Sequence, residues 1–117
     1  MILSKLRMVL PDEHREKILD AILGILEPVR VQSGCRDIRL CMDTENIKTI
    51  ILLDEWKNLN HYKKFLCSEY YKIILSVIEM LSDKPELSIY TNSVILGFDY
   101  VKKVRGSQTR KSRYESS

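Results

Sequence analysis

The segment QSGCRDIRLCMDTENIKTIILLDEW, residues 32–56, contains the clearest secondary-structure signals of the chain. A Ser-Gly turn leads into residues 36–42, whose apolar residues alternate with polar ones, and this pattern predicts a strand with one buried face. The polar residues 43–46 predict a short hairpin connection. Residues 47–56 contain the unbroken apolar run 50–53, as expected of a strand that is covered on both faces. The stretch therefore predicts two neighbouring strands joined by a hairpin.

A strand and a helix are expected before this stretch. Residues 2–9 approximate an alternation of apolar and polar residues, which predicts a first strand. Pro11 suits the first position of a helix, and two acidic residues follow it where the helix dipole favours anions. The apolar stripe in residues 18–26 predicts a helix that ends at Pro28.

A longer helix and a last strand are expected after the stretch. Asn58 suits a helix N-cap, apolar residues follow at spacings of three or four, and Pro85 cannot continue a helix. Residues 87–96 predict a last strand, and residues 97–105 a short helix-like or irregular end. The order β-α-β-β-α-β predicts an α+β, ferredoxin-like fold with an antiparallel sheet.

This fold leaves one face of the sheet bare, because both helices pack on the other face. The third strand is nevertheless apolar on both sides, with Ile50 and Leu52 on one face and Ile51 and Leu53 on the other. Such a patch is unusual on a soluble monomer. The sequence therefore predicts a homodimer in which two copies stack sheet to sheet about a two-fold axis.

Two short motifs resemble those of the antibiotic biosynthesis monooxygenase domain family, in which Glu-Pro-Gly-Cys is followed by Glu-x-Trp and by a His nine residues after the Trp. The chain keeps Gly34, Cys35 and Trp56, and it carries Asp54 in place of the Glu and Phe65 in place of the His. The resemblance implies a dimeric α/β barrel. It also implies that residues 1–105 form one domain of this kind.

The haem-degrading chemistry of some relatives is not expected. Those proteins ligate iron through a His late in the second helix, whereas the only His of that helix here is His61, near its beginning. We expect His61 to point to solvent or to the helix edge. The cysteines and histidines never cluster at ligand spacing, so no metal and no cofactor is predicted.

The chain more closely resembles the family members that oxidise polycyclic phenols without a cofactor. Members with that activity have a Trp at the end of the third strand and a Tyr six residues later, the spacing of Trp56 and Tyr62. The resemblance implies that these two are catalytic candidates and that Leu52, Asp54 and Phe65 line a ligand pocket. Leu52 replaces an Asn of those relatives, an amide that could stabilise an oxyanion. From the residues alone, Trp56 and Tyr62 also fit core positions, and Asp54 fits a salt bridge or a helix cap.

Charge is concentrated at the end of the chain. Residues 102–117 contain six lysines and arginines and one glutamate, so the rest of the chain is mildly acidic although the total net charge is +3. Residues 106–117 therefore predict a basic, disordered tail. A mildly acidic body with such an end does not describe a nucleic-acid-binding domain, and no nucleic-acid partner is expected.

The remaining composition predicts a cytoplasmic protein without a membrane partner. No apolar run is long enough to span a membrane, and the start of the chain is unlike a secretory signal. Cys35, Cys41 and Cys67 are then expected to be reduced. Three functions fit these observations: an oxygenase or related enzyme acting on an apolar, aromatic compound, a non-catalytic small-molecule-binding protein, and a structural dimer.

Overall fold

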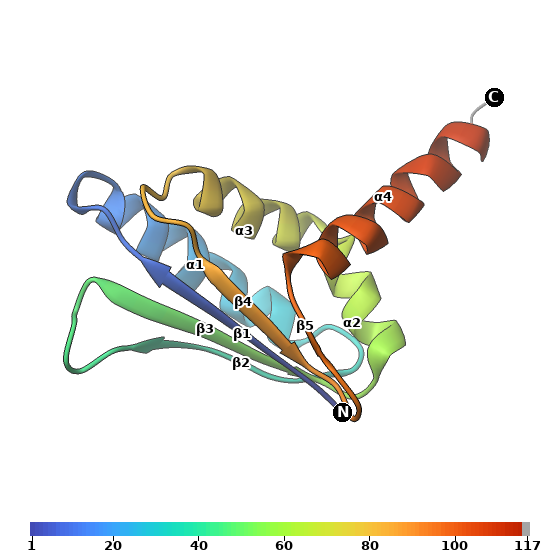
Figure 1. Cartoon of the computed structure of the whole chain (residues 1–117), viewed down its shortest axis with the longest axis horizontal. Coiled ribbons are helices and arrows are strands. Elements are labelled where there is room, and N and C mark those ends of the chain that lie inside the picture. Colours follow the sequence, from blue (N-terminus) through green and yellow to red (C-terminus); the bar gives the residue numbers. More distant parts are fainter. Residues whose placement is uncertain (116–117) are drawn as a thin grey trace.

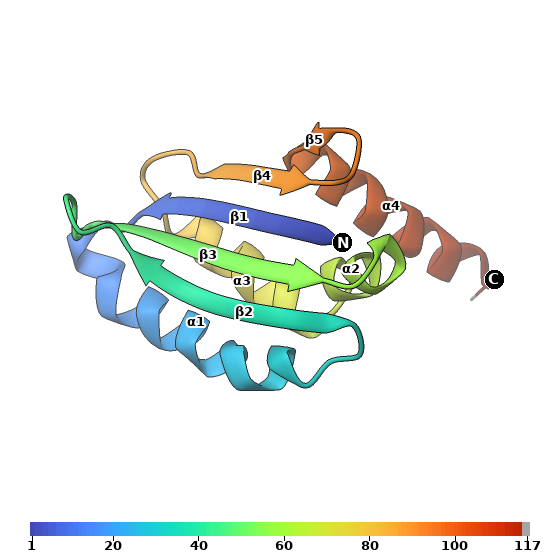
Figure 2. The same cartoon turned by 90° about the horizontal axis from the view of Figure 1, so that it is seen from below.

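A five-stranded antiparallel sheet forms the centre of the molecule. The computed structural model describes the backbone of residues 1–115 and the side chains of residues 1–107. The strands are β1 (Ile2–Val9), β2 (Cys35–Met42), β3 (Thr49–Trp56), β4 (Glu86–Tyr90) and β5 (Ile95–Leu96). They lie in the order β2-β3-β1-β4-β5, and Figure 2 shows one face of the sheet with the helices behind it.

Helices cover the other face of the sheet, as Figure 1 shows. A short 3-10 helix, η1, precedes the first α-helix; the elements are η1 (Asp12–His14), α1 (Arg15–Arg30), α2 (Leu59–Leu66), α3 (Glu69–Glu79) and α4 (Phe98–Glu115). Helices α1 and α3 lie side by side on the sheet, and α2 lies near the end of β3. The arrangement confirms the predicted α+β, ferredoxin-like fold.

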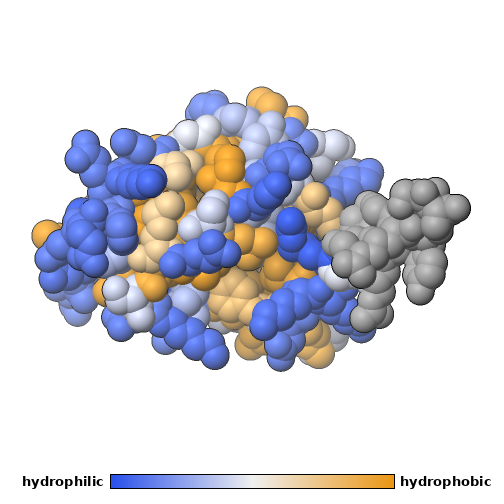
Figure 3. Space-filling view, turned by 90° about the horizontal axis from the view of Figure 1, so that it is seen from above, coloured by the Kyte–Doolittle hydropathy of each residue, from blue (hydrophilic) through white to orange (hydrophobic). Residues whose placement is uncertain are grey.

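The core lies between the sheet and these helices. Along β3, Ile50 and Leu52 face the helices and are at most 1% exposed, whereas Ile51 and Leu53 face the other way and are half-buried. The predicted separation of the two faces is therefore confirmed. Seen from the helix side, apolar side chains show between hydrophilic ones over the middle of the molecule (Figure 3).

The predicted second helix is two helices, α2 and α3, because Ser68 interrupts it. The Ser68 hydroxyl donates to the carbonyl of Phe65 at 2.6 Å and accepts from the amide of Tyr71 at 3.3 Å. It is thus the N-cap of α3, and a serine in this position competes with continuation of the helix. The apolar periodicity runs through the break, which is why the pattern alone predicted one helix.

The predicted last strand is a hairpin. Strands β4 and β5 pair with each other, and residues 91–94 turn between them. The side chain of Thr91 accepts from the amides of Ser93 and Val94 at 3.3 and 3.0 Å, so it satisfies the donors of the turn. The sequence Thr-Asn-Ser therefore favours a turn here over a continuous strand.

Two helices extend past their predicted ends. Helix α1 continues through Pro28 to Arg30. Helix α4 begins in residues 97–105, predicted as a short helix-like or irregular end, and runs on to Glu115, projecting from the body of the molecule (Figure 1). Most of the predicted basic tail, residues 106–117, is thus continuous with α4, while residues 116–117 lie outside the described residues. That the tail is separate from the folded domain remains a prediction.

Two further features bear on the setting of the protein. No helix within the described residues is long and apolar enough to cross a membrane. Cys35, Cys41 and Cys67 are free, as predicted, and each is partly exposed.

Candidate functional site

A buried carboxyl group lies at the inner face of β3. The alternation of side chains along this strand turns Leu52, Asp54 and Trp56 toward the helices, where each is at most 3% exposed. The indole Nε1 of Trp56 donates a hydrogen bond of 2.8 Å to Oδ2 of Asp54. Among the described residues Asp54 makes neither of the contacts that the sequence left open for it, an ion pair or a helix cap.

A chain of hydroxyl groups connects Asp54 to Tyr62. Ser4 is the residue of β1 that pairs with Asp54, and its hydroxyl hydrogen-bonds the carboxyl group. The phenol of Tyr62, from α2, donates to Oγ of Ser4 at 3.3 Å. Because a hydroxyl both donates and accepts, Ser4 can pass a proton between the phenol and the carboxyl. The structure thus brings Asp54, Trp56 and Tyr62 into one buried hydrogen-bonded group.

Burial sets the protonation of this group. Desolvation raises the pKa of Asp54 to about 7, although the hydrogen bonds from Trp56 and Ser4 oppose the shift. At neutral pH the carboxyl is therefore present in both its protonated and its ionised form. Burial, followed by the nearby charge of Asp54, raises the pKa of Tyr62 and of Tyr71, so both phenols stay neutral.

Aromatic rings enclose the carboxyl group. Phe65 stacks on Trp56 with ring centroids 4.7 Å apart, and Tyr71 meets the Phe65 ring edge-on at 5.3 Å. Tyr62 is tilted against Trp56 at 6.4 Å. Such pairs add about 0.5–1.5 kcal/mol each beyond the burial of their area. The rings give the carboxyl an apolar enclosure, which is the physical cause of its raised pKa.

All five residues that the sequence singled out thus lie together. Leu52, Asp54, Trp56, Tyr62 and Phe65 are each at most 4% exposed. The site is closed in this structure, because the side chains of these residues pack against one another and occupy the space that a ligand would need. Their catalytic and binding roles remain predictions.

Sequence reasoning missed two members of the site. Ser4 was not singled out, although a small polar residue at an inward position of a strand is a signal for a buried hydrogen bond. Tyr71 was not among the predicted site residues either; its hydroxyl is buried and has no hydrogen-bond partner among the described residues. An unsatisfied buried donor of this kind is uncommon in native proteins. It is a free hydrogen-bonding group close enough to Asp54 for the carboxylate charge to act on its pKa.

The glycine of the first motif has a steric role. Gly34 adopts φ +83°, and a Cβ on it would lie 2.1 Å from Cγ of His61. Its carbonyl accepts from the amide of Lys57 at 2.8 Å, which ties the turn to the end of β3. Of the two orientations predicted for His61, solvent or the helix edge, the first is wrong: its ring packs over Gly34, and its Nδ1 is buried without a partner among the described residues.

No metal centre accompanies this group. Within the described part of the chain, histidine, cysteine and acidic side chains nowhere gather in a set of three that could hold an ion. The donors beside Asp54 are an indole, a hydroxyl and phenols, a set suited to hydrogen bonding of an organic molecule.

The fold and the site together define a ferredoxin-like domain with a buried carboxyl group in an aromatic enclosure. The chain belongs to the antibiotic biosynthesis monooxygenase family, whose model matches residues 1–74, from β1 into α3. Helix α4 lies beyond the matched residues. A comparison with curated proteins found no match.

Solved structures agree with the family assignment. A conserved protein from Methanosarcina mazei superposes with a TM-score of 0.72 at 22% identity, covering 76% of this chain and 89% of its own. Rv0793 from Mycobacterium tuberculosis gives a TM-score of 0.72 at 15% identity, covering 80% and 95%. A protein described as an antibiotic biosynthesis monooxygenase gives 0.71 at 12% identity, covering 80% and 100%. At these identities the likeness shows the fold.

Proposed function

We propose that the protein is a cofactor-independent monooxygenase that oxidises an apolar, aromatic small molecule. The observation that carries the proposal is the buried Asp54 carboxyl, whose pKa of about 7 suits a general base at neutral pH. Membership of the monooxygenase family supports the reaction class. The aromatic enclosure of Trp56, Phe65 and Tyr71 supports an aromatic substrate.

The chemistry begins with an acidic methylene or phenol of the substrate. Asp54, in its ionised form, takes the proton, and the resulting carbanion or phenolate gives electrons to molecular oxygen. Bond formation between carbon and oxygen yields a hydroperoxide, which loses water to leave a carbonyl group. The balance is a methylene plus dioxygen giving a carbonyl plus water, so no external reductant is consumed.

The hydrogen-bonding groups have distinct tasks in this scheme. Trp56 holds the carboxyl in place through its Nε1. The proton that Asp54 has accepted can pass through Ser4 to Tyr62, whose phenol would deliver it to the peroxide oxygen so that water can leave. Tyr71, whose hydroxyl has no partner among the described residues, can donate to the developing oxyanion. Tyr71 would thus take the role of the Asn amide of the phenol-oxidising relatives, which Leu52 cannot supply.

Substrate entry requires movement of α2. This helix is a separate unit of eight residues, bounded by the Asn58 cap and by the break at Ser68. It carries Tyr62 and Phe65, which close the site from the helix side. Displacement of α2 would open the enclosure while leaving β3 and Asp54 in place, in the manner of an active-site lid.

The closed packing favours a second candidate, a non-catalytic dimer of the same fold that binds a small molecule or has a structural role. Phe65 stacks on Trp56 in the position where the family has a His, and the pair fills space that a substrate would need. In such a protein Asp54 would be a buried structural carboxyl. Oxygen consumption distinguishes the two candidates.

The test is oxygen uptake with anthrone-like substrates by the parent protein and by D54N, Y62F and W56F. Loss of a general base lowers the rate by about a hundredfold or more, so D54N should be nearly inactive. Asp20 is exposed on α1, and D20N is the matched control that should retain the parent rate. Equal rates in the parent and D54N would exclude Asp54 as the base. No uptake by the parent on any such substrate would leave the non-catalytic dimer.

A further inference from the structure

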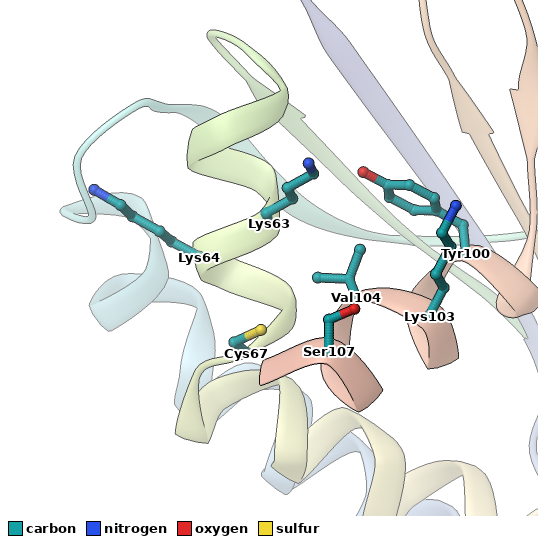
Figure 4. Close-up of a pocket in the computed structure, with 7 residues that line it drawn as sticks. All are labelled: Lys63, Lys64, Cys67, Tyr100, Lys103, Val104 and Ser107. Atoms are coloured by element: carbon teal, nitrogen blue, oxygen red, sulfur yellow. The ribbon is translucent and has the colours of Figure 1, made fainter. Parts of the chain in front are cut away.

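An open pocket lies between α2 and α4 (Figure 4), and none of the five predicted site residues lines it. It has a volume of about 510 Å³, within the range of small-molecule sites. Its walls are Lys63, Lys64, Cys67, Tyr100, Lys103, Val104 and Ser107. Because α4 lies beyond residues 1–74, one wall comes from a segment outside the family match.

The polar lining of this pocket is cationic. Lys63 and Lys64 come from the last turn of α2 and Lys103 from α4, and none of the three forms an ion pair within the described part of the chain. Lys63 extends from α2 toward Tyr100, whereas Lys64 points away (Figure 4). The last turn of a helix favours lysine, which accounts for two of these residues. It does not account for Lys103, which faces the same pocket from a different helix.

Tyr100 supplies a neutral donor at the same place. Its hydroxyl is buried and has no hydrogen-bond partner among the described residues, although its ring lines an open pocket. Burial raises the pKa of this phenol, so the group keeps its proton. A phenol and amino groups are all donors, and an oxyanion is the acceptor that would satisfy them together. Val104 and Cys67 provide an apolar surface beside these donors.

We propose that this pocket binds a small molecule with an apolar or aromatic body and a phosphate or carboxylate group. The anionic group would lie between Lys63 and Lys103 and accept from the Tyr100 hydroxyl, while the body would contact Val104 and Cys67. The inference concerns a site separate from Asp54 and does not depend on the oxygenase proposal. Its test is a binding measurement, so it can fail while oxygen uptake succeeds, and the reverse.

The experiment titrates the full chain with naphthyl phosphate, naphthoate and naphthol while amide chemical shifts are followed by NMR. The two anions should shift amides of the C-terminal half of α2 and of residues 100–107, and neutral naphthol should bind at least tenfold more weakly. The two anionic arms distinguish a phosphate ligand from a carboxylate ligand. Equal binding of naphthol as reported by these same amides, anion-induced shifts centred elsewhere, or no binding of either anion would each overturn the proposal.

Variants separate a built site from general attraction to a basic surface. The double variant K63Q/K103Q should weaken anion binding by about tenfold or more per lysine, as expected for charge-assisted hydrogen bonds. Lys17 and Lys72 are exposed on α1 and α3, and the matched double variant K17Q/K72Q should retain the parent affinity. Y100F, which removes one hydroxyl, should weaken binding several-fold. An equal loss in both double variants would show non-specific attraction and overturn the site.

Discussion

Trp56 donates its indole N–H to the carboxyl of Asp54, two residues earlier on the same strand, at 2.8 Å. Residues two apart on a strand share a face, so both groups enter the core together. The indole N–H is thus satisfied within its own strand, whereas the carboxyl is also hydrogen-bonded by Ser4 of β1. The motif of an acid and a tryptophan separated by one residue is therefore a local device that places a carboxyl group among aromatic rings.

The first prediction concerns stability and pH. The pKa of Asp54 is raised in the folded protein, from 3.8 to about 7, so the folded state binds this proton more tightly than the unfolded state. Ionisation then costs stability: the cost is absent below about pH 4, grows between about pH 4 and 7, and is complete above that. A shift of this size corresponds to a few kcal/mol at most, at about 1.4 kcal/mol per pKa unit.

The variant D54N isolates this contribution. Its amide oxygen can still accept from Trp56, but it cannot ionise. Urea denaturation at a series of pH values should show the stability of D54N relative to the parent rising by a few kcal/mol from about pH 4 to pH 8. A constant difference over this range would show that Asp54 titrates as it does in the unfolded chain.

The second prediction concerns Gly34. A Cβ at this position meets the His61 ring and forces a side chain into φ +83°, so G34A should lower the free energy of unfolding by about 1–3 kcal/mol or more. Gly24 offers the opposite control, because it lies inside α1, where an added Cβ would meet nothing within 4 Å. G24A should raise stability by about 0.5–1 kcal/mol. Thermal melts of both variants check the difference in sign.

The fold could be predicted from the sequence because apolar residues recur periodically in its strands and helices. The alternation in β1 and β2 and the apolar run of β3 identify those strands, although the apolar run does not say which face of β3 is inward. Chain breaks were harder to predict. Ser68 splits a helix whose apolar stripe is continuous. The side chain of Thr91 stabilises a turn in what the pattern predicts as one strand. In both places the hydrogen bonds of a single residue override the periodic pattern.

The candidate site was predicted only in part. The spacing of Asp54, Trp56 and Tyr62 places them together once the fold is known. Ser4 pairs with Asp54 through the register of β1 and β3, and a register cannot be read from either strand alone. The pocket between α2 and α4 was not foreseen, because it depends on where α4 lies in space, and residues 97–105 were predicted only as a short helix-like or irregular end.

The third prediction concerns the end of the chain. Arg105 donates to the carbonyl of Leu66 and so fixes α4 to the C-terminal end of α2, whereas a Cβ at Gly106 would meet nothing within 4 Å. Deletion of residues 107–117 should therefore leave the melting temperature nearly unchanged. Differential scanning calorimetry provides the measurement. A fall of more than about 5 °C, or roughly 1 kcal/mol in a domain of this size, would show that the deleted segment packs on the domain.

The fourth prediction is a homodimer formed through the face of the sheet that the helices leave open (Figure 2). This face carries Ile51 and Leu53 of β3, both half-buried, and Leu3 of β1, which is 36% exposed. It also carries an ion pair between Arg39 and Asp37, so the interface would combine apolar and charged groups. A second copy stacked on it should bury on the order of 1,600 Å² in total.

The substitution L53E places a charge at the centre of this open face, where stacking of a second copy would bury it without a partner. Sedimentation velocity at micromolar concentration should show a dimer for the parent protein and a monomer for L53E, because burial of an unpaired carboxylate opposes association. Leu23 is 53% exposed on the outer side of α1, and L23E is the matched control that should remain dimeric. A parent protein that sediments only as a monomer would refute the dimer. If both L23E and L53E sediment as monomers, the interface would instead involve the helix side of the molecule.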